Sequence, residues 1–281
     1  MLKLSTNSKV AAARQLSKAV CMVRRIFGKS SAGVFKRCGL QYDLDLSEGI
    51  DLAIYLFGTF EKEVGEYCRN VLRAGDHAVD VGANIGAHSL SMARLVGPSG
   101  RVVACEPTDY AFAKLARNLS LNQGIADRVV ASQVFLAANI AEILPAAVAS
   151  SWPLNSSVGV KHELSQGLLK PTTGAVVMTL DSFVAAQRVG PISLLKIDVD
   201  GHELTVLKGS GGTLKQHPAI ILELAPCTAS DGEDTLRQIL HLLHDSGYQT
   251  VTHRRKNFCI TDEDSIFARI PHQGSINVLI R

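Results

Sequence analysis

The sequence has no long apolar run and no uninterrupted apolar segment at its start. No stretch of about 18 or more apolar residues occurs in the 281 positions, which excludes a helix that spans a membrane in the ordinary way. The first residues also lack the apolar core of a secretory signal. We therefore expect an intracellular, cytoplasmic protein.

Cysteine patterns that bind zinc are also missing. The six cysteines are widely spaced, with no Cys-x-x-Cys pair and no histidine at zinc-finger spacing. They are Cys21, Cys38, Cys68, Cys105, Cys227 and Cys259. Thiols scattered in this way are typical of buried or unreactive cysteines in a reducing compartment.

Acidic residues are absent from the first 40 positions, which hold nine Lys or Arg residues. The other 20 basic residues and all 26 acidic residues follow, so positions 41–281 carry a net charge of −6. A mildly acidic body argues against a general nucleic-acid surface, and we expect no nucleic-acid partner.

The basic N-terminal arm, residues 1–45, is expected to be helical or partly disordered. Leu16, Val20, Val23 and Phe27 recur at helical spacing between basic residues. Such a helix can dock on the rest of the chain, lie on an anionic membrane surface as a peripheral contact, or act as an organelle-targeting segment. Docking is the simplest interpretation.

From residue 51 onward, apolar β-branched runs alternate with helical stretches. This pattern is typical of a mainly parallel sheet covered by helices. The expected strands are 77–81, 101–105, 128–135, 192–199 and 219–224. The expected helices are 85–95, 110–122, 202–208 and 234–244.

The end of the chain and its middle depart from this alternation. Residues 248–252 and 275–280 resemble strands without a helix between them, which predicts a terminal hairpin. Residues 137–174 are irregular and contain several Pro, Ser and Gly residues, so we expect an insertion or active-site loop there. Both segments are assigned to one α/β domain, residues 46–281.

A turn of small residues follows the first strand of this domain. Residues 80–86, with the sequence DVGANIG, lead from strand to helix, where the carboxyl ends of parallel strands face a ligand crevice. Gly82 and Gly86 let a ligand approach the backbone, and Asn84 tolerates a left-handed conformation better than other non-glycine residues. Asp80 can reach a cationic amine or accept hydrogen bonds from the amides of the turn.

A dinucleotide fingerprint is the main rival interpretation of this turn. Its Gly-x-Gly-x-x-Gly pattern needs glycines at positions 82, 84 and 87, but the chain has Asn84 and Ala87. Glu106 follows the next strand, 20 residues after Gly86, at the same edge of the sheet, where a carboxylate can accept both hydroxyls of a ribose. The turn and the acid together predict a nucleoside site.

These motifs resemble the FkbM family of methyltransferases. The resemblance rests on residues 79–86 (VDVGANIG), Glu106-Pro107 and residues 195–203 (LKIDVDGHE). Supporting matches extend it over residues 55–225. They are Phe60-Glu61, Glu63, Asn118, Asn122, 179–183 (TLDSF), 207–209 (LKG) and Leu222-Glu223.

The resemblance implies a class I methyltransferase domain, a Rossmann-like three-layer sandwich of the α/β class. Its mainly parallel sheet has seven strands, the last of them antiparallel. S-adenosylmethionine is the implied cofactor and methyl donor, and oxygen is the implied acceptor atom. The implied cofactor-binding residues are Glu61, Asp80, Gly82, Ala83, Asn84, Gly86, Glu106 and Pro107. Within this set, Glu106 would bind the ribose and Glu61 would lie on a segment over the cofactor.

Two positions depart from the family pattern. Asp200 stands where family members often carry Glu, which shortens a carboxylate but keeps its charge. The strand at 128–135 leads into Leu136-Ala137-Ala138, where many members place a polar residue for the adenine amino group. Asn139 is the candidate substitute for that contact.

The candidate catalytic residues lie at and just after the carboxyl end of the strand at 192–199. Lys196, Asp198 and Asp200 alternate on one face of that strand, near its carboxyl end. Asp198 can bind an acceptor hydroxyl or act as a base, with Lys196 paired to it, and His202 is the one histidine that we consider as a base. A purely structural ion pair at the strand end is an equally good interpretation.

Asp198, Asp200 and Glu223 can also converge on a divalent cation, but sequence spacing does not establish such a site, and we predict no metal. The leading function is O-methylation of a hydroxyl on a small molecule or glycan, meaning a sugar, a glycan or a secondary metabolite. The alternatives are an NAD-type oxidoreductase and a non-catalytic S-adenosylmethionine-binding protein.

Overall fold

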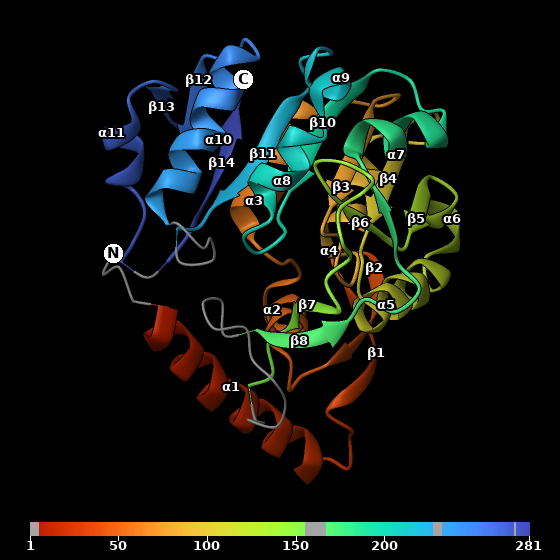
Figure 1. The fold of residues 1–281 in the computed structure, drawn as a ribbon. Helices are drawn as coiled ribbons and strands as arrows, with labels where there is room; N and C mark the ends of the chain where they lie inside the picture. Colours follow the sequence, from red (N-terminus) through yellow and green to blue (C-terminus); the bar gives the residue numbers. More distant parts are fainter. Residues whose placement is uncertain (1–5, 155–166, 227–231, 273) are drawn as a thin grey trace.

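The central sheet consists of short apolar strands that are buried on both faces. The computed structural model describes residues 6–154, 167–226, 232–272 and 274–281, and within them the main sheet has eight strands (Figure 1). Their order across the sheet is β13 (Lys256–Cys259), β12 (Thr250–His253), β14 (Ile276–Ile280), β11 (Ala219–Leu224), β10 (Ile192–Ile197), β3 (His77–Val81), β4 (Arg101–Cys105) and β5 (Val129–Ser132).

The strand directions confirm the class I methyltransferase fold. Strands β11, β10, β3, β4 and β5 are parallel, whereas β14 is antiparallel to both of its neighbours, β11 and β12. The expected seven strands are present, and β13 adds an eighth at the edge through an antiparallel pairing with β12. The sequence did not predict β13, because a tight turn at Arg254 and Arg255, both with positive φ, reverses the chain there.

Two further expectations about strands were wrong. Residues 128–135 do not form one strand, because the chain leaves the main sheet at Gln133 and its next segment, β6 (Val134–Leu136), pairs with β9 (Val176–Met178). The Gln133 side chain holds this departure by donating to the carbonyls of Pro107 and Thr173. The two C-terminal strands were expected without a helix between them, but α11 (Glu263–Phe267) lies between β12 and β14. The side chain of Asp262 caps its first turn.

Helices cover both faces of the sheet. One face packs against α3 (Lys62–Val71) and α4 (Ala87–Leu95), with Ala78, Val102 and Leu194 buried between them. The other face packs against α7 (Leu180–Gln187), α8 (Glu203–Lys208) and α10 (Glu233–Asp245), through alternate residues such as Val79 and Leu195. Three further helices are α5 (Asp109–Ser120), α6 (Gln123–Ala126) and α9 (Gly211–Leu214).

The N-terminal arm is more ordered than its composition suggested. Helix α1 (Thr6–Ile26) is followed by a hairpin of β1 (Ala32–Arg37) and β2 (Leu40–Asp45), and then by α2 (Gly49–Phe57). Leu40, Tyr42 and Leu44 alternate along β2 and are buried against α2 and α4, which is why this basic segment folds as a strand. The division of the chain at residue 45 stays a prediction.

The irregular segment at 137–174 contains a second hairpin. Strands β7 (Ala147–Ser151) and β8 (Leu168–Pro171) pair antiparallel, and in Figure 1 they lie between α1 and the main sheet. Residues 155–166 of the segment, like Cys227, lie outside the described residues. Of the described thiols, Cys68 and Cys105 are buried, as expected, whereas Cys38 and Cys259 are exposed.

Helix α1 is the longest helix of the described chain, but it is not apolar enough to cross a bilayer, and neither is any other helix in the described ranges. The cytoplasmic location stays a prediction.

Asn118 of α5 generates a prediction for stability. Its buried amide accepts a hydrogen bond from the backbone N–H of Asp43 in β2 (2.7 Å) and donates to the carbonyl of Ile85 (2.8 Å). Asn118→Ala leaves both backbone groups unpaired, so we expect the free energy of unfolding to fall by about 2–4 kcal/mol. Urea unfolding measures this, and Asn70→Ala on the exposed face of α3 is the control. Equal effects of the two substitutions would contradict the prediction.

Candidate functional site

The glycine turn between β3 and α4 depends on close backbone contacts. Gly82 has φ +73°, and a Cβ atom there would lie 1.9 Å from the carbonyl oxygen of Asp198, so only glycine fits. The amides of Gly82 and Ala83 both donate to the carbonyl of Cys105. Asn84 adopts the left-handed conformation expected of it, with φ 46°. The turn is therefore fixed by its neighbours on β4 and β10.

A buried ion pair lies directly beneath this turn. Lys196 of β10 is opposite Asp80 of β3 in the sheet register, and its Nζ lies 3.0 Å from Asp80 Oδ1. Lys196 Nζ also donates to the carbonyl of Gly82 (3.1 Å) and lies 3.5 Å from Asp198 Oδ2. The Ser89 hydroxyl of α4 donates to the other Asp80 oxygen (2.6 Å). The turn, the strand end and α4 are thus tied to one ammonium group.

The pKa shifts of this pair favour its charged form. Burial raises the pKa of Asp80, but the charges of Lys196 and His88 outweigh burial and leave the pKa below its usual value. Burial lowers the pKa of Lys196, but Asp80 and Asp198 outweigh it and leave that pKa above its usual value. The pair is therefore ionised over the whole physiological pH range.

Glu106 lies on the opposite side of the turn, at the carboxyl end of β4. Its Oε2 accepts from the backbone N–H of Asn84 (3.0 Å), and its Oε1 accepts from both the amide and the hydroxyl of Thr108. Burial raises the pKa of Glu106, although these hydrogen bonds oppose the rise. The Ser150 hydroxyl of β7 forms a hydrogen bond with the Thr108 hydroxyl (2.8 Å), so the second hairpin, β7–β8, lies close to Glu106.

The glycine turn, Glu106 and the end of β10 line a cavity of about 1450 Å³. Most of the predicted site residues line it: Glu61, Gly82, Ala83, Asn84, Glu106, Pro107, Lys196, Asp198, Asp200 and His202. Two predicted cofactor-binding residues do not line it, Asp80 beneath the turn and Gly86 at the start of α4. The structure also places Asn139 outside the lining; its side chain accepts a hydrogen bond from the amide of Ala141.

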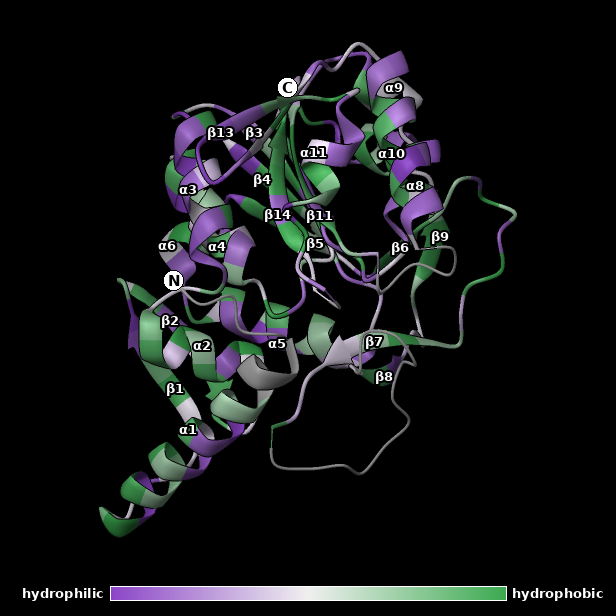
Figure 2. Cartoon of the chain, turned by 90° about the vertical axis from the view of Figure 1, so that its left-hand side faces the viewer, coloured by the Kyte–Doolittle hydropathy of each residue, from purple (hydrophilic) through white to green (hydrophobic). Residues whose placement is uncertain are grey.

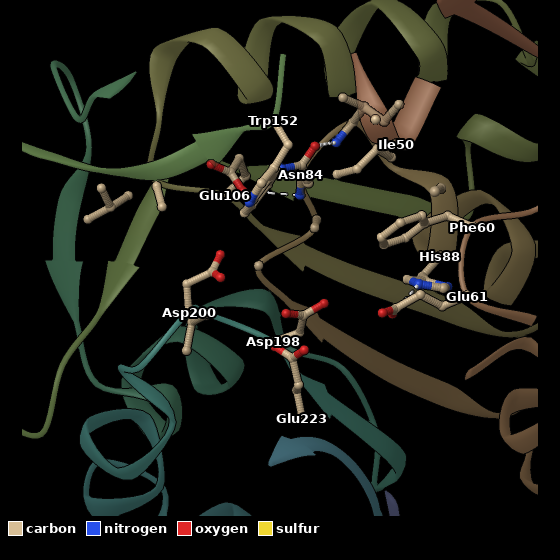
Figure 3. A pocket seen from close by; sticks show the side chains of 18 of the residues that line it. Ile50, Phe60, Glu61, Asn84, His88, Glu106, Trp152, Asp198, Asp200 and Glu223 are labelled. Atoms are coloured by element: carbon tan, nitrogen blue, oxygen red, sulfur yellow. Dashed lines mark hydrogen bonds and ion pairs between the residues drawn. The ribbon is translucent and has the colours of Figure 1, made fainter. Parts of the chain in front are cut away.

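Three carboxylates gather on the floor of the cavity. Asp198 and Asp200 follow β10, Glu223 comes from the adjacent β11, and in Figure 3 the carboxylates of Asp198 and Glu223 point toward one another. Burial raises the pKa of all three groups, and their mutual repulsion adds to the rise for Asp200 and Glu223, which lie well above their usual values. This floor therefore favours neutral hydrogen-bond donors over anions.

Glu61 and His88 form a second polar group on the far wall (Figure 3). Glu61 has a left-handed backbone, φ 46°, at the start of α3, and its Oε2 lies 3.6 Å from His88 Nε2. Both atoms are buried without a hydrogen-bond partner. Burial raises the pKa of Glu61, but His88 and Lys196 outweigh burial and leave the pKa below its usual value. A carboxylate held in this state can accept a hydrogen bond from a bound cation.

Several cavity residues were missed from the sequence. Trp152 lies beside Asn84 and Glu106 in Figure 3, and its backbone is fixed to Glu48 and Gly49 at the start of α2. Phe135 of β6 also lines the cavity and contacts the ring of His202 edge-on, with centroids 5.4 Å apart. The single tryptophan of the chain, in its least regular segment, was the one available signal.

The metal alternative receives no support from the described residues. Among them, no group of three or more His, Cys, Asp or Glu side chains is arranged to hold a metal ion. Asp198, Asp200 and Glu223 all line the floor of the cavity, but their side chains are not arranged to bind one metal ion together.

Comparison with known proteins shows that this chain is similar to methyltransferases. The model of the Methyltransferase FkbM domain matches residues 80–250. Methyltransferase sdnD of Sordaria araneosa is 32% identical over 197 residues, covering 59% of this chain and 75% of the relative. The 31-O-demethyl-FK506 methyltransferase FkbM of Streptomyces tacrolimicus is 30% identical over 220 residues, covering 70% and 82%. Hexuronic acid methyltransferase AglP of Haloferax volcanii is 30% identical over 148 residues, covering 52% and 54%.

The acidic floor generates a prediction for pH dependence. Because the pKa of Glu223 is higher in the folded than in the unfolded chain, the folded state binds more protons. The contribution of this carboxyl to stability is therefore fully present below the usual pKa of a glutamate and is lost as the pH rises through the raised one. We expect Glu223→Gln to raise the free energy of unfolding at about pH 8 and to leave it nearly unchanged at about pH 4.

Urea unfolding across this pH range measures the effect, with Glu233→Gln on the surface of α10 as the matched control. A Glu223→Gln variant with the same pH dependence as the unaltered chain would show that this carboxyl titrates normally.

Proposed function

Because the chain belongs to the FkbM family of methyltransferases, as its motifs predicted, we propose that it is an S-adenosylmethionine-dependent O-methyltransferase. The acceptor in this proposal is a hydroxyl on a sugar, a glycan or a secondary metabolite. The main observation in favour of this proposal is that Glu106, the glycine turn and Asp198 line the same cavity. Hydride transfer, the rival derived from the turn alone, has no support in this family.

The residues of the cavity fit the proposed donor. A carboxylate has about four lone-pair sites, and Glu106 already accepts three hydrogen bonds, so one site, on Oε2, remains for a ribose hydroxyl. The buried Glu61 Oε2, which lacks a hydrogen-bond partner, suits the ammonium group of the methionine moiety. Pro107, Phe135 and Leu136 supply apolar surface for adenine, in place of the polar residue that the family pattern leads one to expect.

When bound, S-adenosylmethionine supplies a methyl group on a positively charged sulfur, and transfer to oxygen leaves the neutral thioether. With donor and acceptor bound, Asp198 would orient the acceptor hydroxyl and take its proton. Such positioning contributes about 7–11 kcal/mol, and a general base adds about 10²–10⁴ in rate. Lys196 acts through Asp198 and the turn, so we assign it as a positioning residue. His202 borders the cavity beside Phe135.

The acidic floor narrows the acceptor class. Burial and neighbouring carboxylates raise the pKa values of Asp200 and Glu223, so these groups suit hydrogen bonds with hydroxyl groups and offer no positive charge to pair with a carboxylate or phosphate on the acceptor. Two relatives are named for acceptors of different kinds, a hexuronic acid for AglP and a demethylated FK506 for FkbM. For this chain we favour a neutral acceptor with several hydroxyls.

The first test concerns the donor. Removing the Glu106 carboxylate with Glu106→Ala deletes the charge-assisted hydrogen bond to the ribose, so we expect S-adenosylmethionine to bind about 10- to 100-fold more weakly in calorimetry. Glu106→Gln should retain part of the affinity, and Glu66→Ala on α3 should retain all of it. No binding of S-adenosylmethionine by the folded, unaltered chain would refute the proposed donor.

The second test concerns chemistry. With labelled donor, we expect methyl transfer to methyl glucoside and little to methyl glucuronide, since the floor is acidic. Asp198→Asn should lower kcat by about 10²–10⁴ while the Kd for the donor changes little, and Asp234→Asn on exposed α10 should change neither. Donor binding without transfer to any hydroxyl compound of a broad panel would favour the non-catalytic alternative.

A further inference from the structure

The arm helix α1 has one face docked on the body. The Ser17 hydroxyl is buried and donates to the carbonyl of Leu46 (2.7 Å), and Ala13 and Val20 pack against the core around β2 and α2. Near the end of the helix, the Arg24 guanidinium lies over the ring of Phe35, 4.8 Å from its centroid. These contacts fix which side of α1 faces outward.

The outward face of α1 is apolar. Met22, Val23, Ile26 and Phe27 are 67%, 53%, 73% and 72% exposed, and Leu16 is exposed one to two turns earlier. Phe27 directly follows α1 and continues its spacing, because its amide donates to the carbonyl of Val23. At 3.6 residues per turn these five side chains fall within a sector of about 140°. An apolar sector of that width normally faces a protein core, but here it faces outward. In Figure 2 the C-terminal end of α1 has hydrophobic colouring and projects beyond the rest of the chain.

Basic residues border this apolar face on one side. Arg14, Lys18 and Arg25 are exposed and follow one another along the helix next to the apolar sector. No acidic residue occurs in the first 40 positions to oppose them. Long basic side chains of this kind place their charge at a polar interface while their stems cover apolar surface. The face therefore combines an apolar surface with a positive flank.

From this combination we infer that the open face of α1 binds an anionic lipid surface. The helix lies in the interface, with Met22, Val23, Ile26 and Phe27 among the acyl chains and the basic flank against the headgroups. A second copy of the chain suits this face poorly, because the same use of it by two molecules brings two positive flanks together. The docked contacts of Ser17 and Val20 stay in place when lipid binds.

This inference does not rest on methyl transfer, but it concerns access to the cavity. Ala11, Ala13 and Arg14 of α1 and the exposed Phe57 of α2 line the cavity as well. The helix that binds lipid in this inference therefore also forms part of the wall of the proposed active site.

Sedimentation with vesicles tests the inference on the full chain. We expect at least about tenfold stronger binding to vesicles of equal parts phosphatidylcholine and phosphatidylglycerol than to phosphatidylcholine alone, weakening as salt is raised. The double variant Ile26→Asp/Phe27→Asp should lose at least about tenfold in binding. The matched control is Ile140→Asp/Ile143→Asp, which changes two exposed isoleucines outside the arm and should bind as the unaltered chain does.

Three results would contradict lipid binding by α1. Equal binding to the two kinds of vesicle, or equal losses in the two double variants, would overturn the inference. So would concentration-dependent self-association, seen by sedimentation velocity, that Ile26→Asp/Phe27→Asp abolishes in a chain that does not bind vesicles. Circular dichroism and donor calorimetry confirm that each variant is folded, and they keep a failure of lipid binding separate from a failure of the proposed methyl transfer.

Discussion

The ammonium group of Lys196 is the interaction on which the candidate site depends. It lies below the glycine turn, forms ion pairs with Asp80 and Asp198, and donates a hydrogen bond to the Gly82 carbonyl. Removing one partner of a buried pair leaves an uncompensated charge, which costs far more than a surface ion pair contributes. Strand register, turn geometry and the position of the proposed base are therefore set together and cannot vary independently.

The parts of the fold that sequence could predict are those governed by local pattern. The runs at β3, β4, β10 and β11 are continuous and apolar, because parallel strands are buried on both faces. Asn84 and Gly82 revealed a turn with positive φ, since few residues tolerate that conformation. The family followed from motifs at these same positions, where backbone geometry leaves little choice of side chain.

The remainder depended on partners distant in sequence. The exit from the sheet at Gln133 is held by the carbonyls of Pro107 and Thr173, and nothing at 128–135 alone predicts it. The β1–β2 hairpin looked like part of a charged arm because its apolar residues are few and alternate. Asp80 looked like a ligand contact, yet the structure turns it inward to Lys196 and places it outside the cavity lining. Whether any side chain contacts a ligand is decided by such long-range packing.

One consequence of the β7–β8 hairpin is spectroscopic. Trp152 follows β7, is the single tryptophan in the 281 residues, and lines the cavity beside Glu106 and Asn84 (Figure 3). Its backbone is fixed by hydrogen bonds to Glu48 and Gly49, so the indole has a defined place in the wall. The tryptophan emission of this molecule therefore comes from one position, and a change in its intensity or wavelength on titration with a small molecule reports on the cavity itself.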